Sequence, residues 1–305
     1  MRTLTVPAGT TPVRLDLFLT NTLPQCSRRT AQRAIAAGDV RIDGRRARKG
    51  VSVTAGHVVQ VPDALYDPPA LQPNQELDVT VLHEDAAVVA LDKPAGMPSH
   101  ALRVDETQTI GNFLLARYPE TGVIGKTRLE PGIVHRLDTE TSGVLLVART
   151  SEAYRSLRQQ FSEHQVRKDY LAVVRGIVSQ PGEVRTSLAH ARHNRAKMRV
   201  CAAESDRQAR PAVTSYRPLE QCGGHTLVAV RISTGVTHQI RVHLASIGHP
   251  VAGDLLYGDP DVSGRTRRHL LHAAAVRFTH PTSATLMQVQ SPSPADFRAF
   301  LDSIR

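Results

Sequence analysis

Cysteine is scarce in this chain of 305 residues, and Cys26, Cys201 and Cys222 lie far apart in the sequence. No two of them have the C-x-x-C spacing and their number is odd, so we expect neither a disulfide framework nor a zinc ribbon. The simplest interpretation is that they are small, incidental thiols.

Long apolar segments are missing as well. No run reaches the roughly 18 apolar residues that a membrane-spanning helix needs. Near the start of the chain, Asp16 interrupts the short apolar patch 15–19, which therefore lacks the apolar core of a secretory signal peptide. We expect a cytoplasmic protein that does not associate with a membrane.

Signatures of cofactor chemistry are also absent. No Gly-rich fingerprint follows a strand-like segment, which argues against a bound dinucleotide. A metal site would have to use His238, His243 and His249, with Asp254 as the nearby carboxylate. Alternation along a strand would place His238 and His243 on opposite faces, so we expect neither a cofactor nor a metal.

Positive charge, in contrast, is in excess, because 38 Lys and Arg residues face 28 Asp and Glu residues and give a formal net charge of +10. Basic side chains that neutralise phosphates release the counterions condensed on a nucleic acid, and this release favours binding. The composition therefore favours a nucleic-acid partner. A soluble basic surface or an anionic membrane face is the alternative interpretation.

Proline marks a boundary in the chain. Residues 62–77, PDALYDPPALQPNQEL, hold four prolines among polar residues and interrupt any periodic pattern, as an interdomain linker does. With 41% hydrophobic residues, the chain is long enough for one large core and a smaller domain. We therefore divide it into an N-terminal domain over 1–62, a linker over 63–77 and a C-terminal domain over 78–305.

The N-terminal domain has the pattern of a small α/β fold. Helical apolar spacing covers residues 13–23 and 27–37, and Ser27 is the expected N-cap of the second helix. The segments 39–44 and 57–62 alternate as strands do. The Asp43–Gly44 pair predicts a tight turn after the first of these strands.

This domain concentrates basic side chains that would follow a phosphate backbone. They lie on the second helix and after the first strand: Arg28, Arg29, Arg33, Arg45, Arg46, Arg48 and Lys49. The pattern over roughly residues 13–60 resembles the S4 RNA-binding domain, and this resemblance implies that the basic residues contact RNA. A solvated basic face on an unrelated small domain is the alternative.

The C-terminal domain is expected to be α+β. Short β-branched segments alternate with helical stretches, without the strict strand–helix–strand rhythm of a doubly wound fold. We expect a mixed, mostly antiparallel sheet. The most informative stretch is GIVHRLDTETSGVLLVART, residues 132–150, which places a charged loop directly before a strand that reads as buried.

Within that stretch, HRLDTETSG resembles the signature of the RluA family of RNA pseudouridine synthases. Three further segments resemble the same family in the same order: VVALDKPAGMPSH at 88–100, KDYLAVVRG at 168–176 and TGVTHQIRVHLASIGHPVAGDLLYG at 234–258. The resemblance spans about residues 78–281, so that with the S4-like module it covers nearly the whole chain.

The resemblance assigns roles to three residues: Asp138 is the nucleophile, and Tyr170 and Arg241 are the active-site tyrosine and arginine. A phenol can stack on the target uracil and exchange a proton. An Arg beside Asp138 would hold the carboxylate ionised and aimed. Without the resemblance, these would read as a turn cap, a core tyrosine and a surface strand residue.

Other residues of the same segments are candidates for RNA contact. A target base stacked in folded RNA must be flipped out, and Arg136 is the expected group to fill the space that it leaves. His135 is a further candidate from the same motif. Lys93, His100 and Gln239 are weaker candidates, either as structural groups or as RNA contacts.

One position departs from the family pattern, which usually reads T-G-R-T-H-Q, because Val236 stands where Arg is usual. We expect altered binding of the substrate and retained chemistry.

The expected activity is the isomerisation of uridine to pseudouridine without a cofactor, by a monomer, in large-subunit ribosomal RNA in preference to transfer RNA. An inactive ribosome-associated RNA-binding factor and an RNA-independent hydrolase are the alternatives. The sequence leaves open whether Asp138 attacks the sugar or the uracil ring, or promotes a glycal route.

Overall fold

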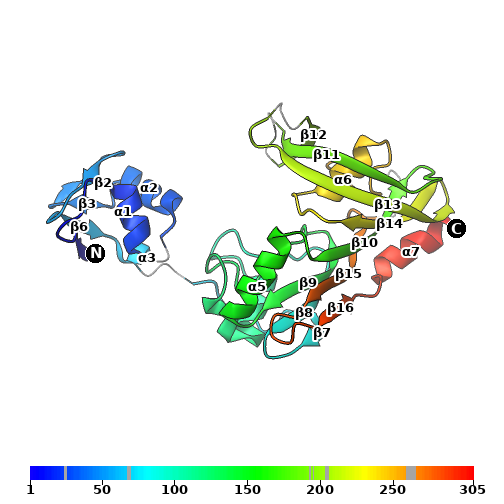
Figure 1. Cartoon of the computed structure of the whole chain (residues 1–305), viewed down its shortest axis with the longest axis horizontal. Coiled ribbons are helices and arrows are strands. Elements are labelled where there is room, and N and C mark those ends of the chain that lie inside the picture. Colours follow the sequence, from blue (N-terminus) through cyan, green and yellow to red (C-terminus); the bar gives the residue numbers. More distant parts are fainter. Residues whose placement is uncertain (24–25, 67–69, 192–193, 195, 203–205, 259–265) are drawn as a thin grey trace. The chain divides into compact units, whose positions relative to one another are not determined.

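A computed structural model describes residues 1–23, 26–66, 70–191, 194, 196–202, 206–258 and 266–305 (Figure 1). The chain forms two compact units, Met1–Leu71 and Gln72–Arg305. Among the described residues, no helix combines the length and the apolar character needed to span a bilayer. The three cysteines are free thiols.

The first unit packs three helices with two small sheets. Its four-stranded sheet has the order β1-β6-β3-β4, and β2 pairs with β5. The bounds of these elements are β1 (Arg2–Thr5), β2 (Val13–Arg14), α1 (Leu15–Thr22), α2 (Arg28–Ala37), β3 (Arg41–Ile42), β4 (Arg45–Arg46), β5 (Ser52–Val53), β6 (Val58–Val61) and α3 (Asp63–Tyr66).

The helix cap and the tight turn predicted in this unit are confirmed, whereas the predicted start of the first helix is not. The Ser27 hydroxyl caps α2 by accepting from the Thr30 N–H. Asp43 and Gly44 both have positive φ, at 48° and 79°, and close the tight turn between β3 and β4. The first helix begins at Leu15 and not at position 13, because residues 13–14 pair with β5 as a strand.

Asp16 joins α1 to α2 by a buried carboxylate. Its side chain is 3% exposed and accepts from Arg14 Nε at 3.0 Å, Arg28 Nε at 3.0 Å and Gln32 Nε2 at 2.7 Å. The hydrogen bond from Arg14 is the largest effect that holds the pKa of Asp16 well below its usual range, against the opposing effect of burial. Arg28, predicted to contact RNA, therefore has part of its guanidinium engaged inside the unit.

We expect Asp16→Asn to lower the free energy of unfolding of the first unit by about 1–3 kcal/mol, because a buried charged acceptor of hydrogen bonds from three side chains is lost. The folded pKa of Asp16 is depressed, so its contribution is present above the unfolded pKa and disappears as the pH falls through the folded one. Calorimetry of the full chain at neutral and acidic pH measures both effects. Asp39→Asn, at an exposed site, is the matched control.

The second unit is built on one ten-stranded sheet of order β12-β11-β13-β14-β10-β15-β9-β8-β7, with β16 added to β15. Its strands are β7 (Thr80–Glu84), β8 (Val88–Lys93), β9 (Ser142–Ala148), β10 (Arg167–Arg175), β11 (Gly182–His190), β12 (Met198–Cys201), β13 (Arg210–Cys222), β14 (His225–Ile232), β15 (Leu271–Thr279) and β16 (Leu286–Gln290). The pairing of β15 with β9 is parallel and the other named pairs are antiparallel. The predicted α+β class with a mixed, mostly antiparallel sheet is confirmed.

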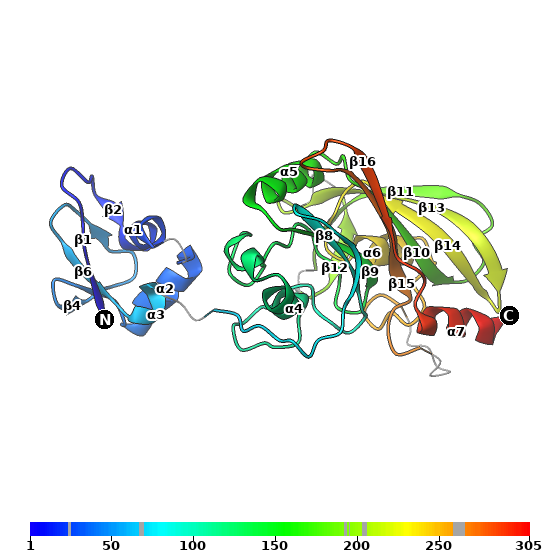
Figure 2. The ribbon, with the colours of Figure 1, turned by 90° about the horizontal axis from the view of Figure 1, so that it is seen from below.

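Helices cover both faces of this sheet. Along β9, which is buried throughout, Leu145 and Val147 join one core cluster while Val144 and Leu146 join another. The first cluster includes α4 and α6, the second includes α5, and α4 and α5 lie on opposite sides of β8 and β9 (Figure 2). These helices, the 3-10 helix η1 and the C-terminal helix have the bounds α4 (Ile110–Arg117), η1 (Pro119–Val123), α5 (Ser151–Ser162), α6 (Gln239–Ser246) and α7 (Ala295–Ile304).

Candidate active site

The loop before β9 holds Asp138 on a rigid base. Both backbone groups of Leu137 are bound by one hydroxyl, since Ser99 Oγ donates to its carbonyl at 2.9 Å and accepts from its N–H at 3.1 Å. The carbonyl of Asp138 accepts from the Thr141 N–H at 3.0 Å. The Asp138 side chain is 24% exposed, so a carboxylate on a fixed loop remains accessible.

Lys93 fastens the same loop from inside the protein. Its side chain is fully buried, and Nζ donates to the carbonyls of Pro94, Met97 and Thr139 at 2.7, 2.8 and 2.9 Å. Burial lowers the pKa of Lys93 to about 7, while the nearby Glu140 carboxylate raises it. Three acceptors require the three donors of an ammonium group. Of the two roles expected for Lys93, these contacts support the structural one.

Arg241 reaches Asp138 from α6, 103 residues further along the chain. The side chain is buried, and Nη1 donates to Asp138 Oδ2 at 2.8 Å. Nε and Nη2 form a fork with Asp254 at 2.7 and 2.9 Å. Burial lowers the pKa of Arg241, but Asp254 and then Asp138 outweigh it and raise the pKa above its ordinary value. The predicted proximity of Asp138 and Arg241 is confirmed; the surface strand expected for Arg241 from its residues alone is wrong, since Gln239–Ser246 is a helix.

Asp254, expected from the sequence only as a possible metal ligand, is instead the counterion of Arg241. It is fully buried, and besides the Arg241 fork its Oδ1 accepts from the N–H groups of Leu256 and Tyr257 at 2.9 and 3.1 Å. Burial raises the pKa of Asp254, but the hydrogen bonds and charge of Arg241 reverse this and lower it. A buried Arg needs a buried counterion, and this requirement was the signal that could have identified Asp254.

Tyr170 lies on the same sheet face as α6. It is buried in β10 within the core cluster that contains Ile240 and Leu244 of α6. The pairing of β10 with β15 shifts register between Asp169 and Leu171, where Tyr170 stands opposite two residues of β15, an irregularity of the kind found next to many active sites. Burial and then the charge of Asp138 raise the pKa of Tyr170, which keeps the phenol protonated.

Arg136 and His135 point to different surroundings. Arg136 is exposed, and its Nη1 donates to His100 Nε2 at 3.2 Å. His135 stacks on Phe161 with ring centroids 4.7 Å apart, and its Nε2 accepts from the Leu146 N–H at 3.0 Å. Burial lowers the pKa of His135 to about 3, consistent with this acceptor role. Arg136 is thus accessible to RNA, whereas His135 makes packing contacts.

Gln239 is a structural link at the start of α6. Its Oε1 accepts from the Thr234 hydroxyl at 2.8 Å and the Val236 N–H at 3.2 Å. Its Nε2 donates to the carbonyl of Val213 at 2.9 Å and to Thr214 Oγ1 at 3.1 Å. Every polar direction of the amide is used within the protein, which supports the structural alternative.

The histidines of the metal hypothesis are separated. His243 is fully buried between the hydroxyls of Thr214 and Thr186, at 2.9 and 3.1 Å. His249 Nδ1 lies 3.0 Å from the carbonyl oxygen of Arg175. In the described part of the chain, no group of three or more metal-ligating side chains is placed to hold an ion.

Val236 packs in a small apolar cluster, together with Leu188, Met198, Ala212 and Val242.

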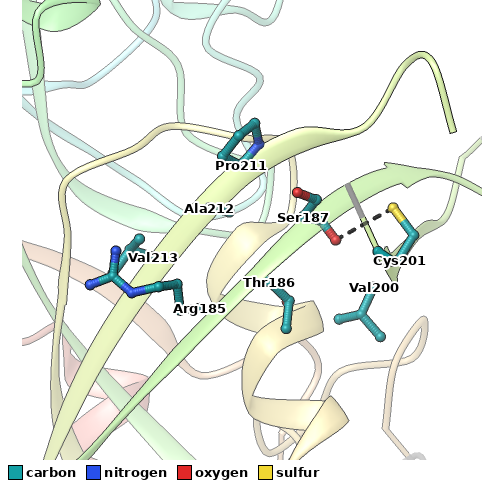
Figure 3. Close-up of a pocket in the computed structure, with 9 residues that line it drawn as sticks. Arg185, Thr186, Ser187, Val200, Cys201, Pro211, Ala212 and Val213 are labelled. Atoms are coloured by element: carbon teal, nitrogen blue, oxygen red, sulfur yellow. Dashed lines mark hydrogen bonds between the residues drawn. The ribbon is translucent and has the colours of Figure 1, made fainter. Parts of the chain in front are cut away.

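A pocket of about 630 Å³ lies on the neighbouring strands β11, β12 and β13, and its lining includes Arg185 (Figure 3). None of the three predicted catalytic residues lines this pocket.

In the first unit, the other basic side chains predicted to contact RNA are exposed. They are Arg29, Arg33, Arg45, Arg46, Arg48 and Lys49. Arg45 and Arg46 lie in strand β4, where a loop was expected.

Similarity to known proteins identifies the family of this chain. The pattern of the RNA pseudouridylate synthase family matches residues 87–246, and that of the S4 domain matches residues 13–59. An uncharacterized RNA pseudouridine synthase of Chloroflexus aurantiacus is 38% identical over 100% of this chain and 94% of its own. Ribosomal large subunit pseudouridine synthase D of Xanthomonas campestris is 34% identical over 100% of this chain and 93% of its own. The solved structure of human RNA Pseudouridylate Synthase Domain Containing 1 is 29% identical, with a TM-score of 0.58 over 73% of this chain and 87% of that one. The protein is therefore a member of the RNA pseudouridylate synthase family that carries an S4 domain.

Proposed function

We propose that this enzyme converts uridine to pseudouridine in large-subunit ribosomal RNA, with Asp138 as the nucleophile. The observation that carries the proposal is the position of the Arg241 guanidinium, which binds Asp138 Oδ2 at 2.8 Å while Asp254 compensates its charge from the other side. This charge-assisted hydrogen bond from a buried guanidinium fixes the position of the carboxylate, and a fixed carboxylate is what nucleophilic attack requires.

In the proposed reaction, the bond between the ribose C1′ and uracil N1 breaks and a bond from C1′ to C5 forms. The proton of C5 leaves and N1 gains one, so the reaction is an isomerisation that consumes no oxidant and no second substrate. The neutral phenol of Tyr170 would stack on the flipped uracil. Arg136, exposed beside the loop of Asp138, would occupy the space that the base leaves.

Two observations support ribosomal RNA as the substrate. The Xanthomonas campestris relative, which is 34% identical over the whole chain, is named for the large ribosomal subunit. The S4 domain adds exposed basic side chains, including Arg29 and Arg33, that suit a phosphate backbone. We further propose a monomer, which is the default for a chain with two domains of its own, and a cytoplasmic location, which suits an enzyme of ribosomal RNA.

Mapping of pseudouridines in all RNAs of a strain that lacks the gene tests the substrate. We expect loss of pseudouridine from large-subunit ribosomal RNA, restored by the wild-type gene and not by Asp138→Asn. Loss confined to transfer RNA would replace the proposed substrate. An unchanged set of pseudouridines in every RNA would contradict both the substrate and the activity.

A further inference from the structure

His238 lies beside the proposed nucleophile in a backbone conformation that L-residues rarely adopt. It is the N-cap of α6 with φ 55° and ψ 18°, in the left-handed region. N-cap residues usually have extended backbone, so the capping role does not require this conformation. Such strain persists where the surroundings over-determine it, commonly at functional sites. The side chain is 17% exposed, and Nε2 lies 4.0 Å from Asp138 Oδ2.

Tyr257 holds the other nitrogen of this ring. His238 Nδ1 and Tyr257 Oη are 2.7 Å apart, and Oη also accepts from the Met198 N–H at 2.7 Å. The tyrosine ring is fixed in turn, with the Arg241 guanidinium carbon 5.2 Å from its centroid. The His238 ring is therefore anchored by a side chain that also contacts the guanidinium of the active site.

The hydrogen-bond partners determine which nitrogen of His238 carries the proton. The phenol oxygen already accepts from the Met198 amide, and its own hydrogen is free to point at His238 Nδ1. Nδ1 is then the acceptor and the proton lies on Nε2. The opposite tautomer would place a nitrogen lone pair against the carboxylate of Asp138. Burial lowers the pKa of His238, against the effect of Asp138, so a neutral ring is expected at neutral pH.

The two cationic or polar side chains nearest to the Asp138 carboxylate face the same oxygen, and of these Arg241 alone lies within hydrogen-bond distance. Arg241 Nη1 donates to Oδ2 at 2.8 Å, and His238 Nε2 is nearest to the same atom. Among the described residues, none donates a hydrogen bond to Oδ1. The two oxygens of the carboxylate are thus distinguished by the protein, with Oδ2 held and Oδ1 open.

We propose that His238 is a positioning residue for the reaction, which presents its Nε2–H to Asp138 Oδ2 and so leaves Oδ1 as the attacking oxygen. This inference rests on the proposed role of Asp138 as the nucleophile. Tyr257 acts through His238, by holding the tautomer and the ring orientation that the contact with Asp138 requires.

His238→Asn is the sharpest test. Asn tolerates the left-handed backbone and its amide oxygen can replace Nδ1 as the acceptor from Tyr257, but it has no group at the position of Nε2. With saturating RNA, we expect single-turnover pseudouridine formation to slow about tenfold. The dissociation constant for RNA should change by less than about twofold, because no RNA contact is removed. A wild-type rate in this variant would overturn the proposal.

Tyr257→Phe, alone and combined with His238→Asn, tests whether Tyr257 acts through His238. The Phe variant keeps the ring against Arg241 and removes only the hydroxyl, and we expect a severalfold slower reaction. Tyr257 is proposed to act only by positioning the His238 ring. The double variant His238→Asn/Tyr257→Phe should therefore react no more slowly than His238→Asn alone, within about twofold. If the rate losses of the two single variants multiply in the double variant, the two residues act independently, and the assignment of Tyr257 is overturned.

His243→Ala is the matched control, because it removes a fully buried histidine from the same helix that is bound by two threonine hydroxyls. It should lower the melting temperature and leave the single-turnover rate unchanged. A rate loss in His243→Ala equal to that in His238→Asn would identify a general effect of damage to α6 and reject the proposal. Activity retained by Asp138→Asn would instead reject the proposed nucleophile, so the two failures are distinguishable.

Discussion

Asp138→Asn is expected to abolish pseudouridine formation, with a rate loss of about a thousandfold or more, while RNA affinity stays within about twofold of wild type. The amide keeps the volume of the side chain, and its oxygen can still accept from Arg241 Nη1, so the loop and the buried ion pair with Asp254 should persist. Charge and nucleophilicity are lost together. Tritium release from RNA labelled at uridine C5 measures the reaction, and filter binding measures the affinity.

The control for this variant is Asp105→Asn, which removes a carboxylate that is 69% exposed and is bound to Arg103 at the surface. It should release tritium at the wild-type rate. Release by Asp138→Asn at a rate near that of the control would remove residue 138 from the chemistry. A large loss of RNA affinity would instead indicate that the carboxylate organises the binding surface.

Arg241→Met is expected to destabilise the second unit by about 3–5 kcal/mol near neutral pH and to stop the reaction. The reason is that Asp254, which is fully buried, would lose the cation that compensates its charge. In the wild type the pKa of Asp254 is lowered, so its contribution to stability is present above the unfolded pKa and is lost as the pH falls. Without Arg241, burial raises the pKa of Asp254, and stability should increase as the pH falls.

Urea denaturation at several pH values measures this reversal of slope. The double variant Arg241→Met/Asp254→Asn removes the unpaired charge as well and should regain much of the lost stability at neutral pH, although not the activity. An Arg241→Met protein as stable as the wild type at neutral pH would contradict the assignment of Asp254 as the essential buried counterion.

Much of the protein follows from local sequence. The Ser27 cap of α2 and the Asp43–Gly44 turn depend on neighbouring residues, and both are present as predicted. The segment HRLDTETSG is long enough to identify the family, and the family match over residues 87–246 agrees with it. Asp138, Tyr170 and Arg241 were found through such segments, since their residue types alone indicated a cap, a core tyrosine and a surface strand.

The α6 segment shows where local pattern misleads. Ile240, Val242 and Leu244 alternate with polar residues, which is the period of a strand. The segment is nevertheless a helix, and it is buried on two sides: Ile240 and Leu244 contact the large core, while Val242 contacts the small cluster that also contains Val236. A helix that packs on both sides need not show a single apolar stripe.

By itself, the sequence determined the family and supplied the candidates for the reacting groups, because both depend on residue types in short segments. Only the tertiary structure decided which charged side chains compensate one another's charge. Asp138 and Arg241 are separated by 103 residues, and Asp254 lies 13 residues beyond Arg241. Neither spacing reveals that the guanidinium lies between the two carboxylates. A buried charge is stable only when its partners surround it in space, and these partners come from the loop before β9 and the segment after α6.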